Sequence, residues 1–222
     1  LTGSSETGRK VLRQAAETVT PTIMELSGCD AVVVLPGADI ARVADCIVFG
    51  LKFNAGATCI APRRIVAEHR EADLLITALR ERLDQAGCAT VHAAARDEAA
   101  KRISDAISSG AVDVLGHFDE RQLLDCGKMS PVLLDGVSPR DEIAAADLFA
   151  PLTSLLRVSS IDEAIEIVNQ CPYRLAVSVF GPGKVAESVA VQLDVGTVCV
   201  NDLIVPTADP RLPFGGRGKS GF

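Results

Sequence analysis

The chain has no tryptophan, and aromatic residues make up only 4% of its 222 residues. A core of this composition has to be aliphatic and rich in alanine, and the 48% of hydrophobic residues is ample for a globular fold. No run of eighteen or more apolar residues occurs, so we expect no membrane-spanning helix. The length suits one large domain, or a domain and a fraction of another.

Paired cysteine motifs are missing too. The seven cysteines are odd in number and widely spaced, and no CxxC pair occurs. This pattern argues against a disulfide scaffold and against a structural zinc site, and it favours reduced thiols. The first ten residues contain no charged leader followed by an apolar stretch, so we expect a cytoplasmic protein without a signal peptide.

Positive charge is scarce as well. The formal net charge is −7, from 22 Lys and Arg against 29 Asp and Glu. Nucleic-acid binding depends on clustered Lys and Arg, which are not seen here. We therefore expect small-molecule chemistry rather than a nucleic-acid or membrane partner.

Strand-like apolar runs alternate with segments of helical period along most of the chain. DAVVVLP (30–36) reads as a buried strand, and the next segment reads as a helix with Asp39 as its N-cap. A second helix is expected to close at Gly87, and a third to span residues 97–108. Such alternation predicts an α/β fold, a layered and largely parallel sheet with helices on both faces. Further strands are expected near residues 63–68, 89–93, 111–117, 130–136, 153–159, 175–181 and 196–201.

The opening LTGSSETGRK reads as the end of a strand, a glycine turn and a helix that begins at Ser4 or Ser5. A helix N-terminus of this kind is able to hold a pyrophosphate, because its unpaired N–H groups and its dipole face an anion. An ordinary capped helix explains the same spacing. A chain does not normally begin at the end of a strand, so we expect a segment upstream of it.

Two residues are candidates for acid–base or nucleophilic chemistry. Glu25 ends a short apolar stretch, where desolvation raises a carboxylate pKa toward that of a general base, although a solvent-facing glutamate fits as well. Cys59 follows the small residues of NAGAT, and we expect a helix end or Arg63 and Arg64 to lower its thiol pKa. The competing interpretation is a small buried hydrophobe, as expected for Cys46.

Seven short motifs, taken in order, resemble the C-terminal half of the aldehyde dehydrogenase superfamily. They are LTGSSETGR, MELSG, FNAGATC, DLFAP, PYRLAVSVF, GTVCVN and PFGGRGKSG. The resemblance implies that Cys59 is the nucleophile, that Glu25 activates water, and that Asn54 belongs to the Asn-x-Gly-x-x-Cys motif. It also implies an NAD or NADP cofactor, bound in part by Gly3, Ser4, Gly8, Leu26, Asp147 and Phe149. Thr58 and Ile60 would shape the pocket for a small aldehyde.

The chain departs from the family pattern at several positions. Ser27 replaces a glycine of Glu-Leu-Gly-Gly, Ala57 stands where glutamine is usual, Asp147 is one methylene shorter than the usual glutamate, and Ala150 replaces a glycine. These departures leave open a non-catalytic relative retained for assembly. An acylating enzyme that uses coenzyme A is a further alternative, although a positioned base at Glu25 favours water.

The resemblance also implies a domain organisation. Residues 1–27 would be a remnant of the dinucleotide-binding domain, and residues 28–222 a catalytic domain with a truncated C-terminal segment. We expect a fragment of a larger, homo-oligomeric dehydrogenase, and we expect these 222 residues to be inactive alone.

Overall fold

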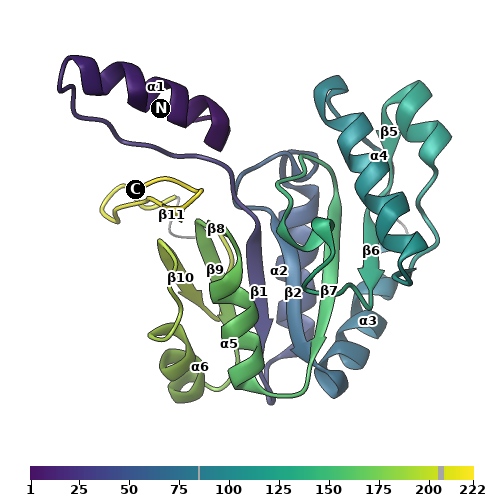
Figure 1. The fold of residues 1–222 in the computed structure, drawn as a ribbon. Helices are drawn as coiled ribbons and strands as arrows, with labels where there is room; N and C mark the ends of the chain where they lie inside the picture. The colour runs from purple at the N-terminus through teal and green to yellow at the C-terminus, as the bar shows by residue number, and fades with distance from the viewer. Residues whose placement is uncertain (85, 205–207) are drawn as a thin grey trace.

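The computed structural model describes residues 1–84, 86–204 and 208–222. In this part of the chain a seven-stranded sheet forms the centre of the molecule (Figure 1). Its strands are β1 (Asp30–Val34), β2 (Pro62–Glu68), β4 (Val112–Asp113), β6 (Val132–Asp135), β7 (Leu152–Val158), β9 (Ala176–Phe180) and β10 (Thr197–Val200). Their order is β10-β9-β1-β2-β7-β6-β4, and all neighbouring pairs are parallel except β4 with β6. Two small antiparallel pairs join β3 (Ala89–Thr90) to β5 (Lys128–Met129) and β8 (Tyr173–Arg174) to β11 (Arg217–Gly218).

The helices begin where local capping chemistry allows. They are α1 (Ser5–Glu17), α2 (Ile40–Lys52), α3 (His69–Leu83), α4 (Ala93–Ser108), α5 (Ile161–Gln170) and α6 (Gly183–Ala190), with the short turns η1 (Phe53–Gly56), η2 (Gln122–Cys126) and η3 (Glu142–Ala145). Asp39 caps α2 as predicted, since its carboxylate accepts from the Arg42 N–H at 3.1 Å.

Two predicted helix boundaries were wrong. The helix expected to close at Gly87 ends at Leu83, where its buried apolar face is complete. The helix expected from residue 97 begins at Ala93 instead. His92 caps it, with a ring nitrogen that accepts from the Ala94 N–H at 3.3 Å, and alanine is the best helix former.

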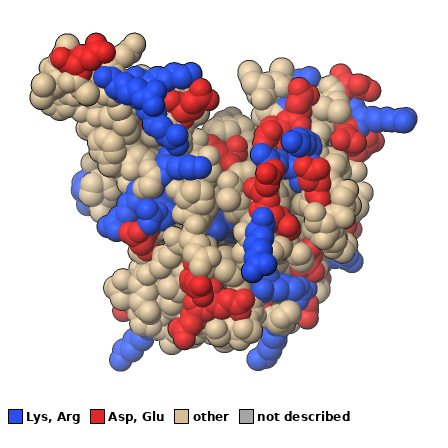
Figure 2. Space-filling view, in the orientation of Figure 1, with Lys and Arg blue, Asp and Glu red and all other residues tan. Residues whose placement is uncertain are grey.

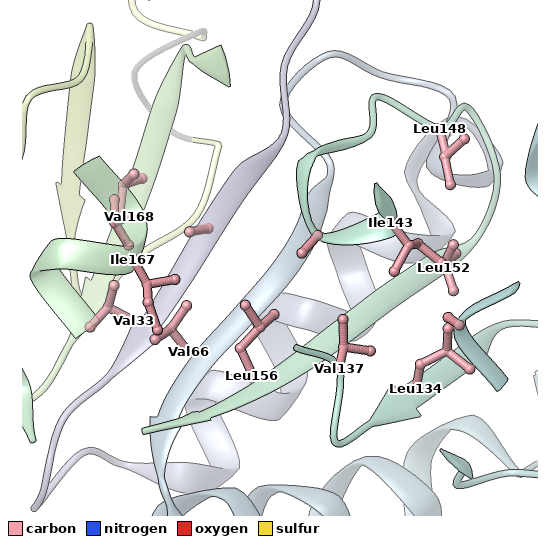
Figure 3. Packing of buried hydrophobic residues seen from close by; sticks show 14 of the residues in the cluster. Val33, Val66, Leu134, Val137, Ile143, Leu148, Leu152, Leu156, Ile167 and Val168 are labelled. Carbon is pink, nitrogen blue, oxygen red and sulfur yellow. The ribbon is translucent and has the colours of Figure 1, made fainter. Parts of the chain in front are cut away.

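Side chains of the central strands alternate between two cores. Val32 and Val34 pack against α2 and α3 on one face, while Val33 and Val66 face α5 on the other. Figure 3 shows Val33, Val66 and Ile167 meeting in the second core. Helices on both faces of a largely parallel sheet confirm the predicted α/β class.

Both ends of the described chain meet at one edge of the sheet. Helix α1 projects from the upper left in Figure 1, and an extended segment leads from it into β1. Glu25 in this segment bridges to Thr2 on one side and to Gly221 on the other. The Ser220 hydroxyl donates to the Ser27 carbonyl at 2.6 Å. The long C-terminal segment is therefore tied to the strand-like entry into β1.

Among the described residues, none of the helices has the length and apolar character needed to cross a bilayer.

Candidate active site

The loops that precede β1, β2 and β7 converge at this edge, because parallel strands place their N-terminal ends together. The loop before β2 carries Cys59. Its backbone is left-handed at Asn54, Ala55 and Gly56, with φ of 49°, 56° and 69°. Only glycine adopts this region freely, so the loop stores strain, and such strain is typical of functional loops. The Asn54 side-chain amide donates to the Ala57 carbonyl at 2.9 Å and braces the turn.

A buried arginine anchors the same loop. The Arg63 guanidinium donates to the carbonyls of Gly56 at 2.5 Å and Thr58 at 3.2 Å, and it also donates to that of Ala150 at 2.8 Å. Arg63 is only 4% exposed. Its fork of donors therefore joins the loop of Cys59 to the start of β7.

Gly28 brings the β1 entry against the nucleophile loop. A β-carbon at Gly28 would lie 1.9 Å from the carbonyl oxygen of Cys59, closer than any real contact. Only glycine allows the two backbones to approach this far. Cys59 itself is half-buried.

The environment of Cys59 overturns one expectation. Burial raises the pKa of its thiol, and the nearby carboxylates Asp30, Asp147 and Glu25 add to the increase. Arg63 and Arg64 were expected to lower this pKa, and that prediction was wrong. Arg63 donates to loop carbonyls, and the Arg64 Nε donates to the Cys29 carbonyl at 3.1 Å. Both guanidinium groups therefore bind backbone carbonyls and do not stabilise a thiolate at Cys59.

Glu25 lies within electrostatic range of Cys59. Its backbone is fixed on both sides, since its N–H donates to the Leu1 carbonyl at 2.8 Å and its carbonyl accepts from the Gly3 N–H at 3.1 Å. The Oε2 atom is buried and has no hydrogen-bond partner among the residues that the structure describes. Desolvation raises the pKa of this carboxyl, which suits a general base.

A cavity of about 490 Å³ opens beside the nucleophile loop. Ala57, Asp147 and Phe149 line it together with His92 and Glu98 from α4. Figure 2 shows the surface hollowed at the top, between the segment that carries α1 and the part that carries α4. No local sequence pattern pointed to His92 and Glu98, because only the packing of α4 beside the 147–149 loop brings them here.

Asp147 is the polar centre of this cavity. Burial raises its pKa to about 6, against the opposing effects of Arg63, the Ser27 hydroxyl and the Gly28 N–H. Its Oδ1 is buried without a hydrogen-bond partner. The Arg63 Cζ lies 5.9 Å from the centroid of the Phe149 ring. An unpartnered acceptor in a cavity of this size fits a ligand that carries hydroxyl groups.

The predicted cofactor residues near the N-terminus have structural partners. The Ser4 hydroxyl accepts from the Thr7 N–H at 3.1 Å and caps α1. Gly8 packs on Leu26, so closely that a β-carbon would lie 2.6 Å from the leucine Cδ1. These contacts fix α1 beside Glu25, and a role in cofactor binding stays a prediction.

The two predicted pocket residues diverge. Thr58 is half-buried, with an Oγ1 that is buried and without a hydrogen-bond partner. Ile60 turns into a separate small cavity of about 20 Å³, which Asp30 and Phe214 also line. Asp30 is a buried carboxylate that the sequence analysis missed; it accepts from the Ala176 N–H at 3.1 Å.

Two solved structures with a similar fold are dehydrogenases. The NADP-dependent glyceraldehyde-3-phosphate dehydrogenase of Bacillus halodurans superposes with a TM-score of 0.89 at 30% identity, covering 100% of this chain and 47% of that one. The salicylaldehyde dehydrogenase of Pseudomonas putida superposes with a TM-score of 0.90 at 26% identity, again over 100% and 47%.

The chain belongs to the aldehyde dehydrogenase family, whose model matches residues 1–222. It is 32% identical to the 4,4'-diaponeurosporen-aldehyde dehydrogenase of Staphylococcus aureus over 230 residues, which cover 100% of this chain and 49% of that relative. The chain spans about half the length of the curated relatives it matches.

Proposed function

We propose that this chain carries the reacting thiol and the base of an aldehyde dehydrogenase that uses NAD or NADP. The reaction would convert a small aldehyde into a carboxylic acid. The observation that carries the proposal is the half-buried Cys59, held in a strained loop within electrostatic range of the unpartnered Glu25 carboxylate.

Cys59 would begin the reaction. Its sulfur, once deprotonated, attacks the aldehyde carbon to give a thiohemiacetal, and the Cys59 backbone N–H provides one donor for the oxygen that becomes negative. A bound NAD or NADP would supply the acceptor for the hydride that this carbon loses. A thioester on Cys59 is left. Asn54 and Arg63 contribute by holding the loop in place, since both donate to its carbonyls.

Glu25 would complete the reaction. Its carboxylate removes a proton from a water molecule, and the resulting hydroxide attacks the thioester carbon. The acid leaves and the thiol is restored. The unpartnered Oε2 and the raised pKa support this role. They favour water over coenzyme A as the acyl acceptor, because a thiol acceptor would not need a base dedicated to water.

Asp147 and Phe149 would hold the ribose on the nicotinamide side. Asp147 lines the 490 Å³ cavity, and its Oδ1 has no hydrogen-bond partner among the described residues, which suits a ribose hydroxyl donor in spite of the shorter side chain. Gly3, Ser4, Gly8 and Leu26 would lie nearer the pyrophosphate. We also propose that the intact protein is a homo-oligomer, as is usual in the family.

Trapping the thioester tests the proposal. The protein that carries this chain, with Glu25→Gln, is incubated with an aldehyde and NAD or NADP, digested with trypsin and analysed by mass spectrometry. The acyl group should accumulate on peptide 53–63, where Cys59 is the only cysteine. Cys59→Ser should abolish oxidation, whereas Cys46→Ser should leave it unchanged, and coenzyme A should not accelerate it. Unaltered oxidation by the Cys59→Ser protein would overturn the assignment.

A further inference from the structure

Two buried cysteines play no part in the proposed reaction, yet they lie against each other. Cys29 immediately precedes β1 and is fully buried, and Cys171 immediately follows α5 and is 6% exposed. Their thiols interact side chain to side chain through a hydrogen bond. The Cys29 sulfur also lies 3.7 Å from the carbonyl oxygen of Ala144, a residue that lines the same cavity as Cys171.

A cavity gives small solutes access to Cys171. It measures about 110 Å³ and is lined by Cys171, Arg64 and Ala144, as well as by Pro139 and Gln170. Pro139 and Gln170 are exposed, so the cavity reaches the surface. Hydrogen peroxide is not much larger than water, whose share of liquid volume is about 30 Å³, and it therefore fits.

The charges around the pair assign different roles to the two sulfurs. The side-chain hydrogen bond with Cys29 is the largest cause that lowers the Cys171 pKa to about 6, while Arg64 also lowers it. The same hydrogen bond, together with burial, raises the pKa of Cys29. A thiolate in contact with a protonated thiol is the arrangement of a reacting and a resolving cysteine. Cys59 differs, because its surroundings raise its pKa.

We propose that Cys29 and Cys171 are a modification site, at which hydrogen peroxide produces an intramolecular disulfide. The Cys171 sulfur attacks one peroxide oxygen, the O–O bond breaks, and the departing hydroxide is protonated to water. This leaves a sulfenic acid on Cys171. The Cys29 sulfur then attacks the Cys171 sulfur, an S–S bond forms and the S–O bond breaks, and the second hydroxide takes the Cys29 proton. Two thiols lose two electrons to one peroxide, and two waters are released.

The disulfide would displace the loop that carries Cys59. Cys29 adjoins Gly28, whose backbone lies against the Cys59 carbonyl oxygen. A disulfide draws Cys29 toward Cys171, because its sulfurs must come within about 2 Å of each other. The β1 entry has no free space at Gly28, so this displacement reaches the nucleophile loop.

Peptide mapping provides the test. The folded chain is treated with a few equivalents of hydrogen peroxide, blocked with N-ethylmaleimide and digested with trypsin. Cys29 lies in peptide 14–42 and Cys171 in peptide 158–174, and neither peptide contains a second cysteine. We expect these two peptides to appear joined, at their summed mass less two hydrogens, and to separate on reduction. Peptide 53–63, with Cys59, should remain unlinked and unoxidised at the same dose.

Controls separate a specific pair from general oxidation. In urea the selectivity for this pair should vanish, since it depends on folded contacts. Cys29→Ser should stop the reaction at the Cys171 sulfenic acid, which dimedone traps, and Cys171→Ser should leave Cys29 unmodified. The rate at which iodoacetamide labels Cys59 should change severalfold after oxidation, and it should return to its original value on reduction. Oxidation of Cys59 before the pair, or over-oxidised Cys171 without any linked peptide in the wild-type chain, would overturn the proposal. None of these readouts needs aldehyde oxidation, so they stand apart from the proposed activity.

Discussion

The backbone of Gly28 lies against the carbonyl oxygen of Cys59, with no room for a β-carbon between them. The contact joins the entry into β1 to the loop that carries the candidate nucleophile. Glu25 lies three residues upstream of Gly28, so the position of the carboxylate relative to the sulfur depends on the same contact. One glycine therefore sets the spacing between the two proposed reacting groups.

Gly28→Ala should displace this loop. A methyl group 1.9 Å from an oxygen forces backbone movement, and we expect a loss of about 3 kcal/mol or more in the free energy of unfolding. Urea denaturation measures this loss. Gly183→Ala is the matched control, because nothing lies within 4 Å of a β-carbon there, and it should be neutral or stabilising by about 0.5 kcal/mol. Equal stability of the two variants would contradict the contact.

The main elements of the fold follow from local signals. The strand at residues 30–36 and the Asp39 cap needed only a β-branched run and a carboxylate one residue before the helix. Strand β3 lies within residues 89–93, where a strand was expected, but the two-residue strands β5, β8 and β11 were beyond such reasoning. Each exists only because a partner far along the chain pairs with it, as Gly218 does with Tyr173.

The candidate site was predictable only in part. Cys59 and Glu25 stood out because their neighbours resemble family motifs. The direction in which nearby charges shift the thiol pKa of Cys59 could not be predicted from the sequence. Proximity in sequence suggested that Arg63 would stabilise a thiolate. In the fold its guanidinium donates to carbonyls, while carboxylates from other segments of the chain raise the pKa of the thiol. Side-chain direction at a loop depends on tertiary packing, which local patterns do not encode.

Asp147→Asn should stabilise the chain at neutral pH. Burial raises the pKa of Asp147 to about 6 from an ordinary value near 3.8, so the folded state binds a proton more tightly than the unfolded state. The stabilisation that comes from the tighter proton binding of the folded state is fully present below about pH 3.8, and it is lost as the pH rises through about 6. The amide cannot ionise. The variant should therefore gain on the order of 2 kcal/mol relative to wild type at pH 7–8, and nothing below pH 4.

Urea unfolding at a series of pH values measures this difference. Asp105→Asn is the control, since Asp105 is exposed on α4, and its unfolding should follow the wild type at each pH. A constant difference between the Asp147→Asn variant and wild type from pH 4 to pH 8 would exclude a raised pKa at this position.

Arg63→Lys should loosen the nucleophile loop although the charge is kept. An ammonium cannot reproduce the planar fork that reaches Gly56, Thr58 and Ala150 together. Buried carbonyls left without donors cost about 1–3 kcal/mol each, so we expect a loss of several kcal/mol. Amide hydrogen exchange at residues 56–59 should accelerate. Arg70→Lys, at an exposed position on α3, should change neither quantity, and unchanged exchange in the Arg63→Lys variant would show that the loop does not depend on the fork.

Asn54 combines a left-handed backbone, at φ 49°, with a side-chain brace to Ala57, and two substitutions separate these contributions. Asn54→Gly removes the brace and keeps the conformation accessible, while Asn54→Ala removes the brace and adds a β-carbon that disfavours positive φ. The brace is exposed and worth about 1 kcal/mol, and left-handed strain adds about 1 kcal/mol more for alanine. Asn54→Ala should therefore lower the free energy of unfolding, measured in urea, more than Asn54→Gly does. The rate at which iodoacetamide labels Cys59 should change in both variants. If alanine proved no more destabilising than glycine, the left-handed strain assigned to residue 54 would have no energetic consequence.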